Sequence, residues 1–222
     1  MTLPRPVKAV VFDMDGLLVA TEQVVFDAMQ LAASGSGRHM PFDLFKRMVG
    51  LPGHASDAIV VEHFGDGFDL DNWRQEVSRH FDLIAEAGIA LKAGVIELLD
   101  VLDAHALPHA VATSSTRRAV EHSLGQHGLV DRFHAIITRE LQTLHKPHPQ
   151  PFLKAAEALR VDPVDCLALE DSHNGVRSAS AAGMMTIMVP DMLDPTEEMQ
   201  SLCVRIAADL HEVRELIERQ EA

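Results

Sequence analysis

The chain has few of the features that secreted and membrane proteins carry. It contains two cysteines, Cys166 and Cys203, and because neither belongs to a zinc-type pair we expect free thiols in a reducing, cytoplasmic compartment. No apolar run approaches the roughly 18 residues of a membrane-spanning helix. Asp13 also interrupts the N-terminal apolar segment too early for a signal peptide. These absences predict a cytoplasmic protein without a membrane anchor.

Basic residues are scarce as well. Lysine and arginine number 19 against 33 aspartates and glutamates, which gives a net charge of −14. Nucleic acids and anionic membrane surfaces require a basic face on the protein, so we expect neither as a partner. An acidic enzyme can still bind an anionic substrate if a metal ion and a few cations are concentrated in one cleft. No motif specifies an oligomeric state.

The 13 histidines are scattered along the chain, and most of them are expected at the surface. His105 and His109 have the i, i+4 spacing of a zinc-binding pair, but Pro108 rules out a helix between them. With 47% hydrophobic residues and a mean hydropathy of +0.04, a chain of this length can bury one globular core and carry a sizeable insertion.

Apolar runs alternate with amphipathic helical segments at the N-terminus and from residue 91 onward. The expected strands are 9–12, 109–112, 135–138, 166–169, 185–189 and 204–207. The expected helices are 93–105, 115 or 116 to about 126, 149 or 150 to 160, 174–182, and one capped by Asp209. In the helix near 150–160 the inward-facing residues should be Phe152, Leu153, Ala156 and Leu159. Repeated strand–helix units of this length predict an α/β fold with a doubly wound parallel sheet.

Residues 20–90 break this alternation. Helices are expected at 21–33, 41–49, 56–63 and 70–86, with no convincing strand between them. We therefore expect a core domain made of residues 1–19 and 91–222, with an all-helical cap domain inserted at 20–90. The insertion leaves the core just after its first strand, where it is placed to cover the residues that end that strand.

Two aspartates one residue apart end the first strand, in the segment Val10–Leu18. Side chains alternate along a strand, so Asp13 and Asp15 should point the same way. They should lie at the carboxyl end of the strand, where open α/β sheets bind ligands. Two carboxylates in one apolar opening repel unless a cation or a shared proton offsets them. A solvated turn is the simplest alternative, and a calcium loop is excluded because its remaining ligand positions are absent.

Polar residues of a particular kind follow the later strands too. Thr113, Ser114 and Ser115 come after residue 112, where hydroxyls and free backbone amides suit phosphate oxygens. Ser115 is also expected to cap the following helix. Lys146 lies in a loop that two prolines make rigid, although a surface lysine is usually only solvated.

The strand at 166–169 runs directly into two adjacent acids, Glu170 and Asp171. Capping of the next helix by Asp171 or Ser172 would account for one acid but not for both.

The order and spacing of these four segments resemble those of the haloacid dehalogenase superfamily of phosphotransferases. The resemblance covers essentially the whole chain, and its motifs are the segments 12–18, 113–114, 146–147 and 170–175. The helical insertion resembles the cap of the beta-phosphoglucomutase and sugar-phosphate phosphatase branch. This implies a Rossmann-like core and a magnesium-dependent phosphatase that acts on a small phosphorylated metabolite, a sugar or nucleoside-type phosphate.

The resemblance also implies roles for individual residues. Asp13 is the nucleophile that forms an aspartyl-phosphate, and Asp15 is the acid that protonates the leaving alcohol and then activates water. Lys146 offsets negative charge, and Thr113 and the Ser114 amide hold the transferring phosphoryl oxygens.

The same resemblance implies a metal site. The implied ligands of Mg²⁺ are Asp13, the backbone carbonyl of Asp15, and Asp171, with Glu170 as a direct or indirect partner.

The sequence departs from the branch in three places. Ala20 and Gln150 replace acids that are common there. The mutases of the branch carry a phosphate-clamping arginine shortly after a glycine like Gly50, but residues 51–54 offer none, which argues against the alternative of a beta-phosphoglucomutase-like phosphosugar mutase.

Other functions are disfavoured as well. A phosphonatase would need a Schiff-base lysine on the cap, where Lys46 has no feature that would depress its pKa. Asp15 argues against a dehalogenase, and a non-enzymatic binding module is disfavoured because every catalytic position is filled. The candidates for substrate contact on the cap are Arg38, Arg47, His54, Arg74 and Arg79.

Overall fold

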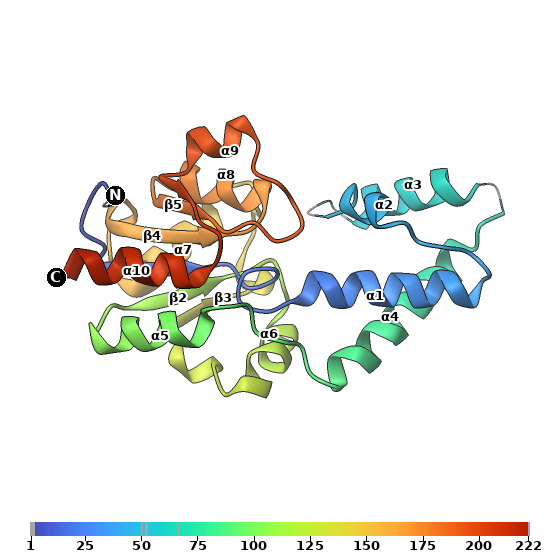
Figure 1. Ribbon diagram of the computed structural model, residues 1–222, viewed down its shortest axis with the longest axis horizontal. Coiled ribbons are helices and arrows are strands. Elements are labelled where there is room, and N and C mark those ends of the chain that lie inside the picture. Colours follow the sequence, from blue (N-terminus) through green and yellow to red (C-terminus); the bar gives the residue numbers. More distant parts are fainter. Residues whose placement is uncertain (1–2, 50, 52, 66, 222) are drawn as a thin grey trace. The chain divides into compact units, whose positions relative to one another are not determined.

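The computed structural model describes residues 3–49, 51, 53–65 and 67–221, with only the backbone of residues 54 and 221 (Figure 1). The chain forms two compact units. The core unit consists of Met1–Val19 and Ala90–Ala222, and the helical unit of Ala20–Ile89.

Six parallel strands form the sheet of the core unit in the order β3-β2-β1-β4-β5-β6. Their bounds are β1 Ala9–Phe12, β2 His109–Ala112, β3 Ala135–Ile137, β4 Cys166–Glu170, β5 Met185–Met188 and β6 Arg205–Ile206. All six lie where the apolar runs predicted them, and the doubly wound parallel sheet is confirmed. The strand order reverses at β1, so the carboxyl ends of β1 and its neighbours form the edge where such sheets bind ligands.

The register of the sheet brings the predicted motifs to this edge. Phe12 pairs with Val111 of β2 and with Leu169 of β4. Because the three strands are parallel and aligned, the residues that follow them emerge together. The segments that begin at Asp13, Thr113 and Glu170 are therefore neighbours in space.

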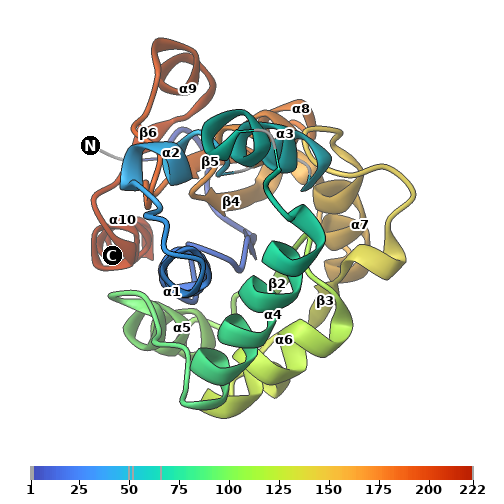
Figure 2. The same ribbon diagram turned by 90° about the vertical axis from the view of Figure 1, so that its right-hand side faces the viewer.

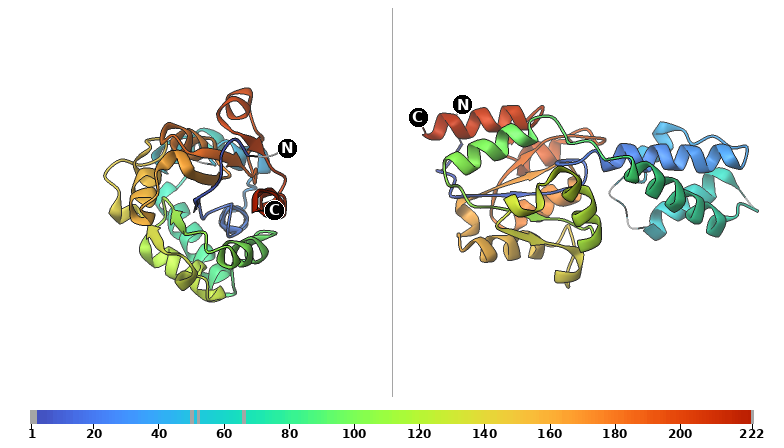
Figure 3. Two further views of the ribbon diagram at one scale, coloured as in Figure 1. Left: turned by 90° about the vertical axis from the view of Figure 1, so that its left-hand side faces the viewer. Right: turned by 90° about the horizontal axis from the view of Figure 1, so that it is seen from below.

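Helices cover both faces of this sheet (Figure 2, Figure 3). The helices are α5 Val95–Ala104, α6 Arg117–Ser123, α7 Gln150–Leu159, α8 His173–Ala181, α9 Glu197–Leu202 and α10 Leu210–Glu221. Short 3-10 helices occupy Gly125–His127, Val130–Arg132, Arg139–Leu141 and Pro163–Asp165. Helix α7 packs against β1, β2 and β3, and α8 packs against β4 and β5, whereas α5 and α10 pack against each other.

One detail of the core differs from expectation. Leu153 was predicted to face inward but is 39% exposed, because the buried stripe of α7 runs through Phe152, Ala155 and Ala156 at helical spacing. His109 is fully buried against the rings of Phe12 and Phe133, whereas the other histidines with described side chains are exposed or half-buried, as expected for most histidines.

The helical unit contains helices and, within its described residues, no strand, as the sequence predicts. Its helices are α1 Thr21–Gly35, α2 Phe42–Lys46, α3 Gly53–Phe64 and α4 Leu70–Glu86. Helices α1 and α4 pack against each other, with α4 inclined to α1 (Figure 1). Across the described part of the chain, no helix has the length and apolar character needed to cross a membrane.

Candidate active site

A buried lysine joins the ends of two strands. Lys146 Nζ lies 2.5 Å from Asp13 Oδ1 and 2.6 Å from Glu170 Oε1. The three side chains are at most 9% exposed. Asp13 follows β1 and Glu170 ends β4, so the lysine bridges the two central strands of the sheet. A charge pair this deeply buried needs good geometry to offset the cost of desolvation.

Burial controls the ionisation of this group. It raises the pKa of Asp13 to about 8; Lys146 opposes the rise, while the carboxylates of Glu170 and Asp15 add to it. Burial by itself would lower the pKa of Lys146, but the ion pairs with Asp13 and Glu170 outweigh it and raise that pKa. The lysine is therefore charged, and Asp13 is held between an attractive cation and repelling anions.

The second oxygen of Glu170 is also occupied. Glu170 Oε2 accepts hydrogen bonds from the backbone N–H of Asp171, at 3.0 Å, and of Ser172, at 3.1 Å. It accepts a third from Ser172 Oγ at 3.0 Å. Ser172 Oγ in turn accepts from the N–H of Gly175, which makes Ser172 the cap of α8. Of the two caps that the sequence allowed, Ser172 is the one formed, and Asp171 is a buried acid beside it.

Two glycines leave room for these carboxylates. A Cβ atom on Gly175 would lie 1.7 Å from Glu170 Oε1, far closer than any real contact. A Cβ on Gly16 would lie 2.3 Å from Asp171 Oδ2, and Gly16 has a φ of +81°, a conformation that favours glycine. Both glycines are thus required by the acids that they contact.

Three acids are close enough together to hold a metal ion. Ligand atoms of Asp13, Glu170 and Asp171 all lie within 4.8 Å of one another, and all three residues are buried. Carboxylate oxygens are the ligands that hard divalent cations prefer. The acids therefore fit a divalent cation, which would offset their mutual repulsion. The carboxylate of Asp15 lies outside this group; the sequence-based prediction assigned only its backbone carbonyl to the metal.

Two hydroxyl groups from the loop after β2 contact Asp15. Ser115 Oγ donates to Asp15 Oδ2 at 2.6 Å, and Thr113 Oγ1 donates to the same oxygen at 3.3 Å. The backbone N–H of Ser115 donates to Thr113 Oγ1 at 3.0 Å. Ser114, predicted to bind phosphate, is exposed.

The sequence allowed Ser115 or Thr116 as the cap of the next helix and favoured Ser115, but Thr116 is the cap that is formed. Thr116 has the extended backbone of an N-cap residue, and its side chain accepts the N–H of Ala119 at the start of α6. The hydroxyl of Ser115 is therefore available to Asp15, a role that the sequence analysis missed.

Gln150, one of the three departures from the branch, has a structural role. Its Oε1 accepts the backbone N–H groups of Thr143, at 2.8 Å, and of Leu144, at 2.9 Å. These bonds fasten the loop that carries Lys146 to the first turn of α7. An amide oxygen has two lone pairs, so Gln150 can accept both N–H groups in place of the carboxylate common at this position.

A fifth strand end also supplies an acid, which the sequence analysis did not predict. Asp191 follows β5. A Cβ atom placed on Gly16 would lie 3.3 Å from Asp191 Oδ2 and 2.3 Å from Asp171 Oδ2, so both acids lie close to the backbone of Gly16. Lys92 Nζ pairs with Asp191 Oδ1 at 2.5 Å. Val189 and Pro190 separate Asp191 from the end of β5, so the rule that found the other acids, a polar residue directly after a buried strand, does not find it.

The described arginines of the helical unit already have partners within that unit. Arg47 pairs with Glu62, Arg74 with Asp57 and Asp71, and Arg79 with Glu76, while Arg38 lies over the rings of Phe64 and Phe68. The side chain of His54, and Gly50 and Pro52 in the segment of the mutase clamp, lie outside the described residues.

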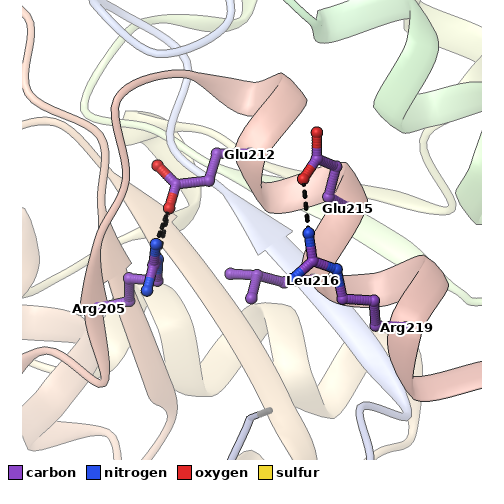
Figure 4. Close-up of a pocket in the computed structure, with 5 residues that line it drawn as sticks. All are labelled: Arg205, Glu212, Glu215, Leu216 and Arg219. Atoms are coloured by element: carbon purple, nitrogen blue, oxygen red, sulfur yellow. Dashed lines mark hydrogen bonds and ion pairs between the residues drawn. The ribbon is translucent and has the colours of Figure 1, made fainter. Parts of the chain in front are cut away.

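A hollow on the surface of the core unit holds none of the predicted site residues (Figure 4). It is lined by Arg205 of β6 and by four residues of α10: Glu212, Glu215, Leu216 and Arg219. Arg205 pairs with Glu212, and Arg219 with Glu215, so its charges neutralise one another.

Known proteins are similar to this chain in sequence and in fold. A family model described as haloacid dehalogenase-like hydrolase matches residues 10–189. The "Probable pseudouridine-5'-phosphatase" of Drosophila melanogaster is 33% identical over 193 residues, which cover 84% of this chain and 83% of that protein. Hexitol phosphatase B of Escherichia coli K12 is 34% identical over 198 residues, 86% of each chain. A crystal structure named "putative beta-phosphoglucomutase from Thermotoga maritima" superposes with a TM-score of 0.81 at 26% identity, over 96% of this chain and 99% of that one.

Proposed function

The chain belongs to the haloacid dehalogenase-like hydrolase family, and we propose that it is a magnesium-dependent phosphatase that hydrolyses a sugar or nucleoside-type phosphate. The resemblance inferred from four motifs is confirmed by the family match. The observation that carries the proposal is the buried group of Asp13, Lys146 and Asp171 at the carboxyl ends of β1 and β4. The relatives from Drosophila melanogaster and Escherichia coli bear the names "Probable pseudouridine-5'-phosphatase" and "Hexitol phosphatase B", which supports small phosphorylated metabolites as substrates.

Asp13 is the nucleophile in this proposal. Its carboxylate attacks phosphorus, a bond from Asp13 to phosphorus forms, and the bond from phosphorus to the leaving oxygen breaks. Asp15 gives its proton to that oxygen. Water then loses a proton to Asp15 and attacks the aspartyl-phosphate, which releases phosphate and restores Asp13. The short contact from Lys146 to Asp13 supports this assignment, because it favours the ionised carboxylate that must attack.

The phosphoryl group would be held by groups on the second and third motifs. Lys146 supplies a buried positive charge, and the hydroxyl of Thr113 and the amide of Ser114 supply donors at the end of β2. Thr113 is fully buried and held by its neighbours, which supports a fixed position. Donors fixed in this way need no reorganisation as charge develops on the phosphoryl oxygens.

Asp13, Asp171 and the backbone carbonyl of Asp15 would hold the magnesium ion. When bound, Mg²⁺ neutralises charge on the transferring phosphoryl oxygens. Glu170 would act indirectly, because one of its oxygens already contacts Lys146 and the other accepts three hydrogen bonds. A cytoplasmic location belongs to the same proposal, and the free state of both cysteines supports it.

A phosphosugar mutase is the second candidate, because a structural relative bears the name of a beta-phosphoglucomutase. A mutase must hold a bisphosphate at both ends. Arg47 and Arg74 would have to leave their ion pairs with Glu62 and Asp57 to supply the second clamp. The paired state of these arginines favours hydrolysis.

The test is a screen of phosphorylated metabolites, including pseudouridine 5'-phosphate and hexitol phosphates, for released phosphate. Asp13→Asn should abolish turnover while circular dichroism stays unchanged, because the amide is nearly isosteric but is no nucleophile. Appreciable activity in a folded Asp13→Asn variant would contradict the covalent mechanism. With glucose 1-phosphate and a bisphosphate primer, phosphorus NMR should detect inorganic phosphate. Accumulating 6-phosphate would instead establish a mutase.

A further inference from the structure

The hydrogen bonds around Asp15 fix one of its two carboxyl oxygens. Both hydroxyls of the loop after β2 reach Oδ2, Ser115 at 2.6 Å and Thr113 at 3.3 Å. Within the described part of the chain, no such bond reaches Oδ1. An oxygen that accepts two donors is a poor site for a proton, so the proton that Asp15 exchanges belongs on Oδ1.

The two hydroxyls are not equivalent. Thr113 Oγ1 accepts the N–H of Ser115 and has one hydrogen to give, which it gives to Asp15 in a long contact. If Thr113 turns that hydrogen to a phosphoryl oxygen, as the proposed function requires, its bond to Asp15 is lost. The shorter bond from Ser115 then remains as the contact that orients the carboxyl group.

We propose that Ser115 is a positioning residue that holds Asp15 by Oδ2 and so presents Oδ1 to the leaving oxygen. The inference rests on the proposed phosphatase function. Ser115 needs no contact with substrate for this role. Its backbone N–H holds Thr113 while its side chain holds Asp15, so one residue fixes both groups.

Replacement of Ser115 by alanine tests this role, because it removes the hydroxyl and keeps the backbone bond to Thr113. With sorbitol 6-phosphate, whose alkoxide leaves poorly without a proton, rapid-quench measurement should show enzyme phosphorylation slowed by about 10- to 100-fold. With p-nitrophenyl phosphate, whose leaving group needs no proton, the phosphorylation step should change less than about threefold. KM and inhibition by inorganic phosphate should stay near wild type, since Ser115 does not bind the phosphoryl group.

Two further variants control the experiment. Ser115→Thr keeps a hydroxyl on Cβ and should recover most of the rate on sorbitol 6-phosphate. Ser201→Ala removes an exposed hydroxyl that contacts only the local backbone of α9 and should behave as wild type. Melting temperatures of all three variants should lie close together, which separates positioning from a loss of folding.

Two results would overturn the inference. An equal loss on both substrates with weaker inhibition by phosphate would show that Ser115 binds the phosphoryl group. An unchanged rate on sorbitol 6-phosphate would show that Ser115 does not orient Asp15. The wild-type rate on sorbitol 6-phosphate tests the proposed function itself. A crystal structure of Ser115→Ala tests the orientation of Asp15 independently of turnover. A carboxyl group of Asp15 that has not moved in that structure would count against the proposal.

Discussion

Substitution of Gly175 by alanine should both destabilise and inactivate the protein. The new Cβ would lie 1.7 Å from Glu170 Oε1, 1.8 Å from its Cδ and 2.1 Å from its Oε2. Real Cβ atoms do not approach other atoms within 3.0 Å, so the carboxylate has to move by more than 1 Å. Glu170 cannot move into solvent, because its side chain is fully buried.

The cost follows from the bonds that such a movement breaks. It separates Glu170 from Lys146 Nζ, now 2.6 Å away, and from the donors of Asp171 and Ser172. Breaking a buried ion pair costs about 3–5 kcal/mol. For a chain of this size each kcal/mol lowers the melting temperature by roughly 2–4 °C, so we expect a decrease of about 10 °C. Phosphate release should fall at least about tenfold, because Lys146 loses one of its two anchors.

Gly125→Ala is the matched control. Nothing lies within 4 Å of a Cβ at Gly125, and its backbone is not in the left-handed region. This variant should melt at or slightly above the wild-type temperature, since alanine restricts the unfolded chain more than glycine does. Scanning calorimetry on both variants compares their melting temperatures, and a phosphate-release assay compares their rates. A Gly175→Ala protein with wild-type stability and rate would refute the assigned position of Glu170.

Three further predictions concern metal and pH. Activity should vanish on chelation and return with Mg²⁺. Ca²⁺ should be a poor substitute because it prefers more ligands and looser geometry. Full activity after exhaustive chelation would contradict the proposed role of Asp171. Folding raises the pKa of Asp13 to about 8, so the metal-free protein loses stability as pH rises toward and through that value. The increase in melting temperature caused by Mg²⁺ should therefore grow from pH 6 to pH 9. In Asp13→Asn the increase caused by Mg²⁺ should be small and independent of pH. Burial lowers the pKa of His109, so the unfolded chain binds the proton more readily and stability falls as pH drops below about 6.5. His109→Asn should lose less melting temperature between pH 7.5 and pH 5 than wild type, and a variant of the exposed histidine, His39→Asn, should lose as much as wild type.

The strands could be predicted because each lies in a short, largely apolar run that ends in a turn or polar signal. Every residue of β1, β2, β4 and β5 is buried, and such runs stand out from the amphipathic helices around them. Parallel pairing then follows from the alternation with helices, and the edge shared by the motifs follows from parallel pairing. Asp13, Glu170 and Asp171 could be located for the same reason, whereas Lys146 was located by the two prolines of its loop and Asp191, which lies farther from its strand, was not found.

The role of Ser115 could not be predicted from local sequence. Ser115 and Thr116 are both good caps, and which of them caps α6 depends on backbone angles that a sequence does not specify. The partner of Ser115, Asp15, lies 100 positions earlier and meets it only through the pairing of β1 with β2. The prediction that Leu153 faces inward was wrong for a simpler reason. A shift of one residue along a helix turns a side chain by about 100° and moves it off the buried stripe.

The charges at the strand ends explain why an acidic protein of this kind needs a cation to bind phosphate. The carboxylates gathered there come from Asp13, Asp15, Glu170, Asp171 and Asp191, and the two lysines that contact them are Lys146 and Lys92. A phosphate dianion added to this excess of negative charge would be repelled. Burial is the main cause of the raised pKa of Asp13, and the carboxylates of Glu170 and Asp15 add to it, because protonation of Asp13 reduces the negative charge of the metal-free site. A divalent cation at the three clustered acids would reduce the charge without a proton and would leave Asp13 ionised, as the proposed mechanism requires, so the proposed need for metal follows from how the acids are arranged.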